Sequence, residues 1–156
     1  MRVLVGHADY RFDALAAALV DGDPSRADAC VEIVSGTSQL TGLLSEIFRQ
    51  VVTVDVSRQL LADAPPGLGS SIQADAATLP IVTGSMAAVV GINVVPHPAE
   101  IRRVLRPGGV LALVSPRIAE PPMLRDIPTV VGALGRDWSA VDLKTRWGRW
   151  TLMRQG

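Results

Sequence analysis

Short apolar runs rich in β-branched residues alternate with amphipathic segments along most of the 156-residue chain. Residues 30–34, 51–56, 87–95 and 109–115 are apolar at nearly every position, as is typical of strands buried on both faces of a sheet. Helical periodicity separates them, most clearly in the segment that begins at Pro98, because proline is favoured in the first turn of a helix. Strands joined by helices need right-handed crossovers that cover both faces of a parallel sheet. The pattern therefore predicts an α/β protein with a doubly wound, mostly parallel sheet.

The predicted helices carry their apolar residues three and four positions apart. Residues 9–20 and 40–48 each form one such stripe, and either Thr37 or Ser38 is expected to cap the second of these helices. Ser57 is expected to cap a short third helix directly after the strand at 51–56. These caps place each helix start close to the carboxyl end of a strand.

The last third of the chain differs in kind. Residues 121–135 are helical in period, but Pro128 interrupts them, which predicts either one kinked helix or two short ones. The segments on either side of Gly148 carry alternating apolar positions, which predicts an antiparallel hairpin. With a weak strand at 71–76, the elements predict a single domain over residues 1–156: five parallel strands, and a hairpin at one edge.

Composition argues against several classes of function. The 15 acidic and 15 basic residues cancel, and binding nucleic acid or an acidic membrane needs a basic excess. Cys30 is the only cysteine, and His7 and His97 are the only histidines, which argues against an internal disulfide and a structural zinc site. No apolar run approaches the roughly 18 residues of a membrane span. We therefore expect a cytoplasmic protein that needs no metal and binds neither nucleic acid nor a membrane.

A glycine turn and an acid at a strand end indicate a nucleotide site. The first predicted strand ends at Val34, and residues 35–38 turn into a helix whose free N–H groups can bind an anion. Asp55 follows Gly36 by nineteen positions and ends the next strand, where an acid can accept both hydroxyls of a ribose. In such sheets a ligand binds where the strand order reverses, here beside the first strand. The plainer alternative is that Gly36 serves the turn alone and Asp55 caps the following helix.

The same segments resemble the class I S-adenosylmethionine-dependent methyltransferases. The matching segments are residues 31–44 for the family's first motif, 51–57 for the second, 71–80 for the third, and 104–116 for the segment entering the fifth strand. The resemblance covers about residues 28–116. It implies a seven-stranded Rossmann-like sheet of order 3-2-1-4-5-7-6, in which the C-terminal hairpin supplies the last two strands.

The resemblance also implies a site for S-adenosylmethionine. Glu32 matches the acid of the first strand, and Asp55 matches the ribose-binding acid. Asp75, with the backbone of Ala76, matches the pair that contacts the adenine. His97 falls where many members carry a polar residue near the methyl group, so it is either a general base or an ordinary loop residue. The residues expected at the cofactor are Glu32, Ser35, Gly36, Thr37, Asp55, Val56, Asp75, Ala76 and Asn93.

Departures from the family pattern predict that S-adenosylmethionine binds weakly or not at all. The family loop is typically G-x-G-x-G, and Val34 and Ser38 replace two glycines that let the backbone approach the ligand or take a positive φ. The apolar-Asp pair that normally opens the fourth strand is missing. The segment after His97 is about two helical turns shorter than usual, and no long insertion covers the substrate side.

Two functions remain open on these grounds. One is a non-catalytic methyltransferase-like domain that acts as a partner or interaction protein. The alternative is a methyltransferase for a small-molecule acceptor, in which proximity and orientation supply most of the catalysis. A dinucleotide reductase domain fits less well, because the RPGG segment and the hairpin have no role there.

Three tryptophans stand among arginines in the last nineteen residues. Trp138, Trp147 and Trp150 either pack the predicted hairpin onto the last helix or form an interface with a protein partner or a second copy of the chain. The sequence leaves both interpretations open.

Overall fold

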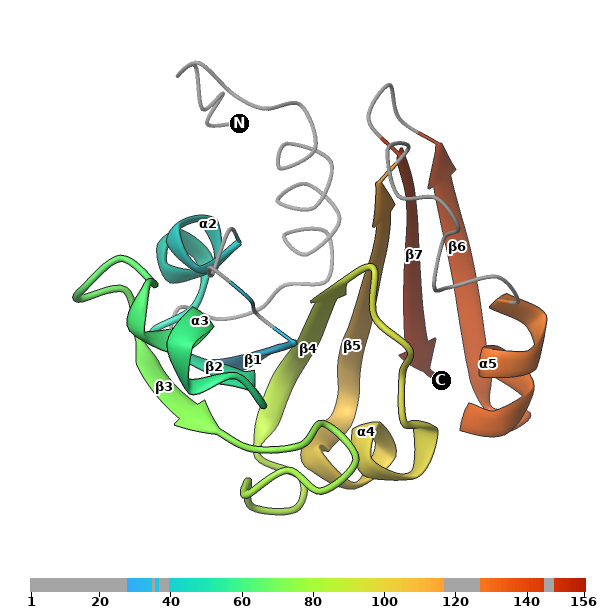
Figure 1. The fold of residues 1–156 in the computed structure, drawn as a ribbon. Helices are drawn as coiled ribbons and strands as arrows, with labels where there is room; N and C mark the ends of the chain where they lie inside the picture. Colours follow the sequence, from blue (N-terminus) through green and yellow to red (C-terminus); the bar gives the residue numbers. More distant parts are fainter. Residues whose placement is uncertain (1–27, 35, 37–39, 117–126, 145–147) are drawn as a thin grey trace.

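A computed structural model of the chain describes residues 28–34, 36, 40–116, 127–144 and 148–156 (Figure 1). The strands are β1 (Ala29–Ile33), β2 (Gln50–Asp55), β3 (Ser70–Gln73), β4 (Met86–Ile92), β5 (Leu105–Pro116), β6 (Trp138–Lys144) and β7 (Gly148–Gln155). The helices are α2 (Thr41–Ile47), α3 (Arg58–Ala62), α4 (Pro98–Val104) and α5 (Ile127–Leu134). The helix predicted over residues 9–20 lies outside the described residues.

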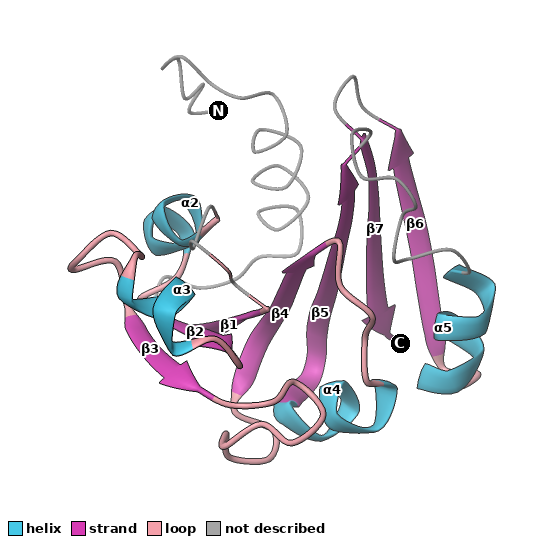
Figure 2. Cartoon of the chain, viewed as in Figure 1, coloured by secondary structure: helices cyan, strands magenta, loops and turns pink. Residues whose placement is uncertain are grey.

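All seven strands belong to one sheet, in the order β3-β2-β1-β4-β5-β7-β6. The five strands from β3 to β5 in this order pair in parallel, whereas β7 runs antiparallel to both β5 and β6. Figure 2 shows the C-terminal hairpin completing one side of the sheet. The α/β class, the strand order and the closing hairpin that the sequence predicted are confirmed.

Two apolar clusters hold the layers together, one on each face of the sheet. The first contains Ile101 of α4 and Leu134 of α5 together with Leu111 of β5. The second contains Leu44 of α2 together with Trp150 of β7. The sheet is therefore covered on both faces, which explains why its central strands are apolar at almost every position.

Three local predictions can be compared with the structure. Ser57 caps α3 as predicted, because its hydroxyl accepts the N–H of Leu60 at 3.3 Å. The predicted caps of α2, Thr37 or Ser38, are wrong. Leu40 occupies the N-cap position, and its side chain makes no capping hydrogen bond. The described part of the segment around Pro128 is one helix, α5, and the proline lies in its first turn, where its missing N–H costs nothing.

The two described tryptophans are buried rather than exposed. Trp138 lies in the cluster with α4 and α5, and Trp150 lies in the cluster on the opposite face. Trp147 lies outside the described residues. Within the described part of the chain, no helix is long and apolar enough to cross a membrane.

Gly91 of β4 tests how tightly the sheet packs near its carboxyl edge. A Cβ atom at this position would collide with Cγ1 of Val94 and lie 3.2 Å from Cγ1 of Ile33. We expect Gly91→Ala to lower the free energy of unfolding by about 1–3 kcal/mol, since overpacking forces neighbouring side chains to shift. Gly132→Ala in α5 is the matched control, because no atom lies within 4 Å of its added Cβ.

The control should raise the free energy of unfolding by about 0.5–1 kcal/mol, since alanine favours a helix over glycine. Urea denaturation of both variants measures the two changes. Effects of the same sign would contradict this account of the packing.

Candidate functional site

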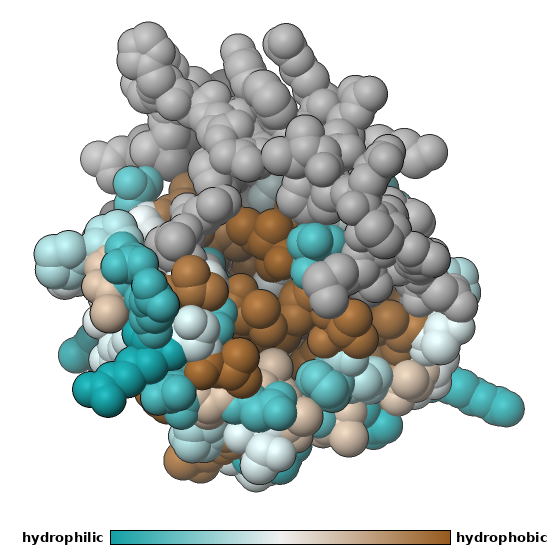
Figure 3. Space-filling model, in the orientation of Figure 1, coloured by the Kyte–Doolittle hydropathy of each residue, from teal (hydrophilic) through white to brown (hydrophobic). Residues whose placement is uncertain are grey.

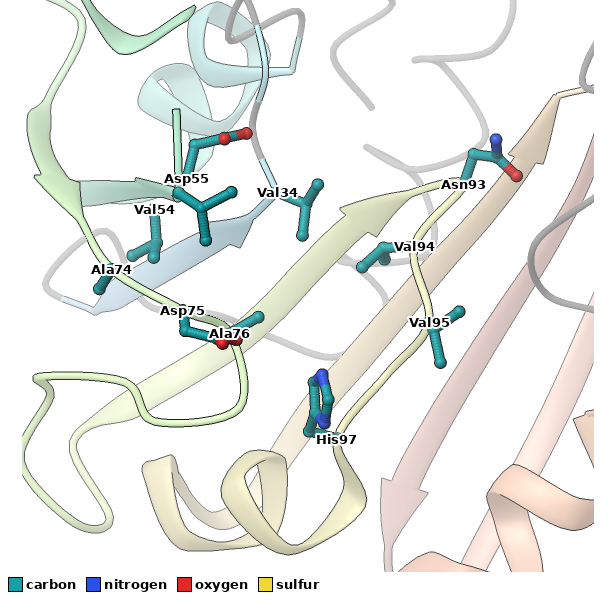
Figure 4. Close-up of a pocket in the computed structure, with 11 residues that line it drawn as sticks. Val34, Val54, Asp55, Ala74, Asp75, Ala76, Asn93, Val94, Val95 and His97 are labelled. Carbon is teal, nitrogen blue, oxygen red and sulfur yellow. The ribbon is translucent and has the colours of Figure 1, made fainter. Parts of the chain in front are cut away.

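A cavity of about 200 Å³ opens at the carboxyl ends of the parallel strands, where the strand order reverses between β1 and β4. The residues that line it are Val34, Val54, Asp55, Val56, Ala74, Asp75, Ala76, Asn93, Val94, Val95 and His97 (Figure 4). Figure 3 shows hydrophobic surface gathered around a hollow in the middle of this face. The position is the one where open α/β sheets bind ligands.

Most of the residues that the sequence indicated meet at this cavity. Those that line it are Asp55, Val56, Asp75, Ala76, Asn93 and His97. Gly36 contributes through its backbone, whereas Ser35 and Thr37 lie outside the described residues. Four further lining residues were not predicted, because they carry no motif and only their nearness to strand ends marks them in the sequence: Val54, Ala74, Val94 and Val95.

Asp55 joins the end of β2 to the loop after β1. The residue is 4% exposed, and its carboxylate accepts the N–H of Gly36 at 2.9 Å on Oδ2 and that of Ser57 at 2.8 Å on Oδ1. A carboxylate offers about four acceptor positions, so two remain for a ligand. Asp55 therefore has a structural task of its own and can still accept the two hydroxyls of a ribose.

Asp75 and Ala76 form the turn that closes the side of the cavity next to β3. Oδ1 of Asp75 accepts the N–H of Ala77 at 2.8 Å, and its backbone oxygen accepts the N–H of Thr78 at 2.9 Å. The Asp75 side chain is exposed, and Ala76 is buried against the cavity. The turn is thus fixed by its own hydrogen bonds before any ligand arrives.

Two non-glycine residues have a positive φ in the described part of the chain, and both line this cavity. Val34 has a φ of 50°, and Asn93 has a φ of 48°. Asparagine tolerates this left-handed conformation, but for a β-branched residue it is a true outlier that costs about 1–2 kcal/mol. Strained residues of this kind cluster at functional sites, which marks this cavity as the candidate site.

The side chain of Val34 projects into the cavity. In Figure 4 it lies between Asp55 and Val94, across the gap that separates the ends of β1 and β4. It is 45% exposed, so it fills part of the opening without being covered. A glycine at this position would hold the same backbone conformation without strain and would leave this space open.

His97 lies at the other end of the cavity, at the N-cap position of α4. Its backbone oxygen accepts the N–H of Ile101 at 3.0 Å, whereas its side chain does not cap the helix. The residue also lines a second cavity of about 360 Å³ together with Glu100 and Arg103. Its imidazole therefore stands between two spaces in which small molecules could lie.

Glu32 does not line the cavity, although the sequence analysis grouped it with the cofactor residues. It is 2% exposed, and its carboxylate accepts the hydroxyl of Thr41 at 2.5 Å and the N–H of Leu40 at 3.4 Å. The carboxylate thus holds the start of α2 through the N–H of the N-cap residue Leu40 and the hydroxyl of Thr41, a different contact from the cap expected of Thr37 or Ser38. Burial raises the pKa of Glu32, and the hydrogen bonds from Thr41 and Leu40 oppose this rise.

A sequence model of the family described as "Methyltransferase domain" matches residues 31–113, more than half of the chain and every residue of the cavity. The chain belongs to the class I S-adenosylmethionine-dependent methyltransferase family. A 23S rRNA (guanine(748)-N(1))-methyltransferase from Streptomyces fradiae is 33% identical over 95 residues, or 58% of this chain and 34% of that enzyme. The methyltransferase domain described here therefore spans about a third of that relative's length.

Solved structures share the fold at lower sequence identity. The protein mmp1179 from Methanococcus maripaludis superposes with a TM-score of 0.73 and 16% identity, covering 94% of this chain and 85% of that one. The N-methyltransferase NodS from Bradyrhizobium japonicum WM9 gives 0.66 and 16% identity, covering 94% and 97%. These likenesses establish the methyltransferase fold of this chain and say nothing of its substrate.

The raised pKa of Glu32 makes part of the domain's stability depend on pH. The unfolded carboxyl titrates near its ordinary value of about 4.3, and the folded one titrates higher. As the pH rises between these two values, the unfolded state loses its proton first, so this residue's contribution to stability falls. Glu32→Gln does not titrate, and its amide oxygen can accept one of the two hydrogen bonds while its NH2 group donates to the Thr41 hydroxyl, which can also accept.

We therefore expect the free energy of unfolding of Glu32→Gln, relative to the wild type, to improve steadily as the pH rises above about 4.3. Urea denaturation of both proteins at several pH values between 4 and 8 measures this difference. A difference that stays constant across the range would show that the folded carboxyl titrates normally.

The strain at Val34 predicts that its removal stabilises the domain. Val34→Gly should raise the free energy of unfolding by about 0.5–1 kcal/mol, because relief of the left-handed strain exceeds the added entropy of the unfolded glycine. Val82→Gly is the matched control: Val82 is 76% exposed, lies away from the cavity and has no positive φ. The control should lower the free energy of unfolding by a similar amount, and a loss in both variants would contradict the assignment of strain.

Proposed function

We propose that this methyltransferase domain retains the adenosine half of its cofactor site, binds S-adenosylmethionine weakly, and acts as a non-catalytic partner of another protein. The observation that carries the proposal is the side chain of Val34, which projects into the cavity from a backbone conformation that suits glycine. The residues of the cavity suit the adenosine half of the cofactor better than its amino-acid half.

The adenosine half fits. Asp55 keeps two acceptor positions for the vicinal hydroxyls of a ribose, since backbone N–H groups use only two of the four. Val56 and Ala74 supply apolar surface against which a base can pack, and the backbone of Ala76 lies at the cavity wall. These groups already lie at the cavity, so adenosine can bind without their rearrangement.

The amino-acid half fits poorly. Its place in the family pattern is beside the loop glycines, and Val34 puts a branched side chain there. The cavity of about 200 Å³ is also smaller than the roughly 300–1,000 Å³ of pockets that enclose a drug-sized ligand. A ligand with the full length of S-adenosylmethionine would have to displace this side chain or leave its tail in water.

A methyltransferase for a small-molecule acceptor remains the second candidate, and one observation favours it. His97 lines both the first cavity and the neighbouring cavity of about 360 Å³, where an acceptor could lie. In that case Asp55 would orient the cofactor through its ribose, and His97 would accept a proton from the acceptor. The cofactor would supply the activated methyl group.

The likeness to an rRNA methyltransferase does not carry its substrate over to this chain. A zero net charge gives no basic excess to neutralise RNA phosphates, so we propose no nucleic-acid partner. The partner we propose is a protein or a second copy of the chain, held at the C-terminal hairpin. β6 is an edge strand that exposes Val141, and edge strands offer unpaired backbone groups. The single free, buried Cys30 agrees with a cytoplasmic location.

Thermal unfolding with ligands tests the weak-binding proposal. A ligand at about 100 times its dissociation constant adds roughly 2.7 kcal/mol to stability, which corresponds to about 5–10 °C for a domain of this size. We expect 1 mM S-adenosylmethionine to shift the wild type by less than about 2 °C. Val34→Gly should show a larger shift, Val82→Gly should not, and adding Asp55→Asn to Val34→Gly should remove it.

The opposite result is equally clear. A shift of 5 °C or more in the wild-type protein that Asp55→Asn abolishes would show an intact cofactor site. Methyl transfer by that protein to a small acceptor, lost in His97→Ala, would then establish the enzyme alternative.

A further inference from the structure

We infer that the cavity selects an adenine nucleoside whose 5′ substituent is uncharged and apolar, such as a 5′-thioether of adenosine that lacks an amino-acid tail. The inference rests on the proposed adenosine site and adds what lies next to the ribose. Three features of the cavity support it: its apolar rim, its acidic side chains, and the two backbone N–H groups that Asp55 already accepts.

The rim of the cavity is the place where exposed apolar side chains gather. Six large hydrophobic residues are exposed in the described part of the chain, and three of them, Val34, Val56 and Val95, line this one cavity. Their exposed fractions are 45%, 63% and 50%. In Figure 4, Val34 lies at the end of β1, and Val95 lies in the segment that leads from β4 to α4. Concentrated exposed apolar surface marks a binding site for an apolar group.

The charges that line the cavity oppose an amino-acid tail. Its ionisable side chains are Asp55, Asp75 and His97, and no lysine or arginine stands among the described lining residues. The α-carboxylate of a homocysteine tail would enter an apolar rim beside two acidic side chains, with no cationic partner among the described residues that line the cavity. A charge in apolar surroundings without a partner is costly to desolvate. An uncharged thioether avoids this cost and gains contact with the valines.

Asp55 does not compensate by holding the ammonium group of such a tail. Two of its acceptor positions serve Gly36 and Ser57, and the remaining two serve the hydroxyls of the ribose. An ammonium at this carboxylate would compete with the ribose rather than add to its binding. At Asp55 the tail therefore finds no unclaimed acceptor, and at the exposed Asp75 an ammonium gains little, because water screens the ion pair.

Isothermal titration calorimetry with three probes tests the inference on the full chain. The probes are adenosine, 5′-methylthioadenosine and S-adenosylhomocysteine, which differ only at the 5′ position. We expect 5′-methylthioadenosine to bind about tenfold more tightly than adenosine, because its methylthio group is buried against the rim. S-adenosylhomocysteine should bind more weakly than 5′-methylthioadenosine.

A matched pair of variants connects the selectivity to the rim. Val34→Thr keeps the branched shape but replaces one methyl with a hydroxyl, so the tenfold preference should fall to about threefold. Val82→Thr makes the same change at an exposed valine outside the cavity and should leave the preference unchanged. Adenosine itself should bind the wild type and Val82→Thr alike.

The possible failures are distinguishable. Equal affinities for adenosine and 5′-methylthioadenosine would overturn the inference and leave the adenosine site standing. Tighter binding of S-adenosylhomocysteine than of 5′-methylthioadenosine would also overturn it, and would show that the amino-acid half is accommodated. If none of the three probes binds, the proposed adenosine site itself is wrong.

Discussion

The reversal of strand order between β1 and β4 creates the space on which every feature of the candidate site depends. β1 pairs with β2 on one side and with β4 on the other, and the helices that follow these strands pack on opposite faces of the sheet. The connections therefore diverge from one edge and leave a crevice between strand ends. Asp55 fixes one wall of this crevice by accepting the N–H of Gly36, so that the loop after β1 is tied to the end of β2.

The strain at Val34 follows from the same constraint. Ile33, directly before it, is buried and paired with Val54 in the ladder, and Gly36, two residues later, is held by Asp55. Val34 lies between these two anchors with a φ of 50°, a left-handed conformation that suits glycine rather than a β-branched residue. The fold thus imposes the conformation of a glycine on a valine and directs its side chain into the crevice. A valine in place of glycine at this position therefore costs the sheet little stability, but its side chain changes which ligand the cavity can accommodate.

The sequence predicted the sheet more completely than the site, and the differences have local causes. Apolar periodicity and the family resemblance were sufficient for the strand order, because buried parallel strands leave a clear pattern. The strand predicted over residues 87–95 ends at Ile92, since Asn93 turns left-handed and donates its N–H to Val114 at 2.6 Å. Val95 therefore leaves the ladder and joins the cavity rim. The start of α2 was mispredicted because its acceptor, Glu32, lies eight residues away on another element.

Glu32 and Asp55 also show why acidic motifs alone do not distinguish a catalytic domain from a non-catalytic one. Glu32 supports the start of α2 from the interior, and Asp55 anchors the loop after β1. Both contacts stabilise the fold whether or not a cofactor binds, and removing either acid would leave N–H groups without their acceptor. These acids are expected to persist in a domain that has lost its ligand. Val34 contributes strain rather than stability, so the fold does not require a valine at this position. Val34 is therefore more informative about ligand binding than either acid.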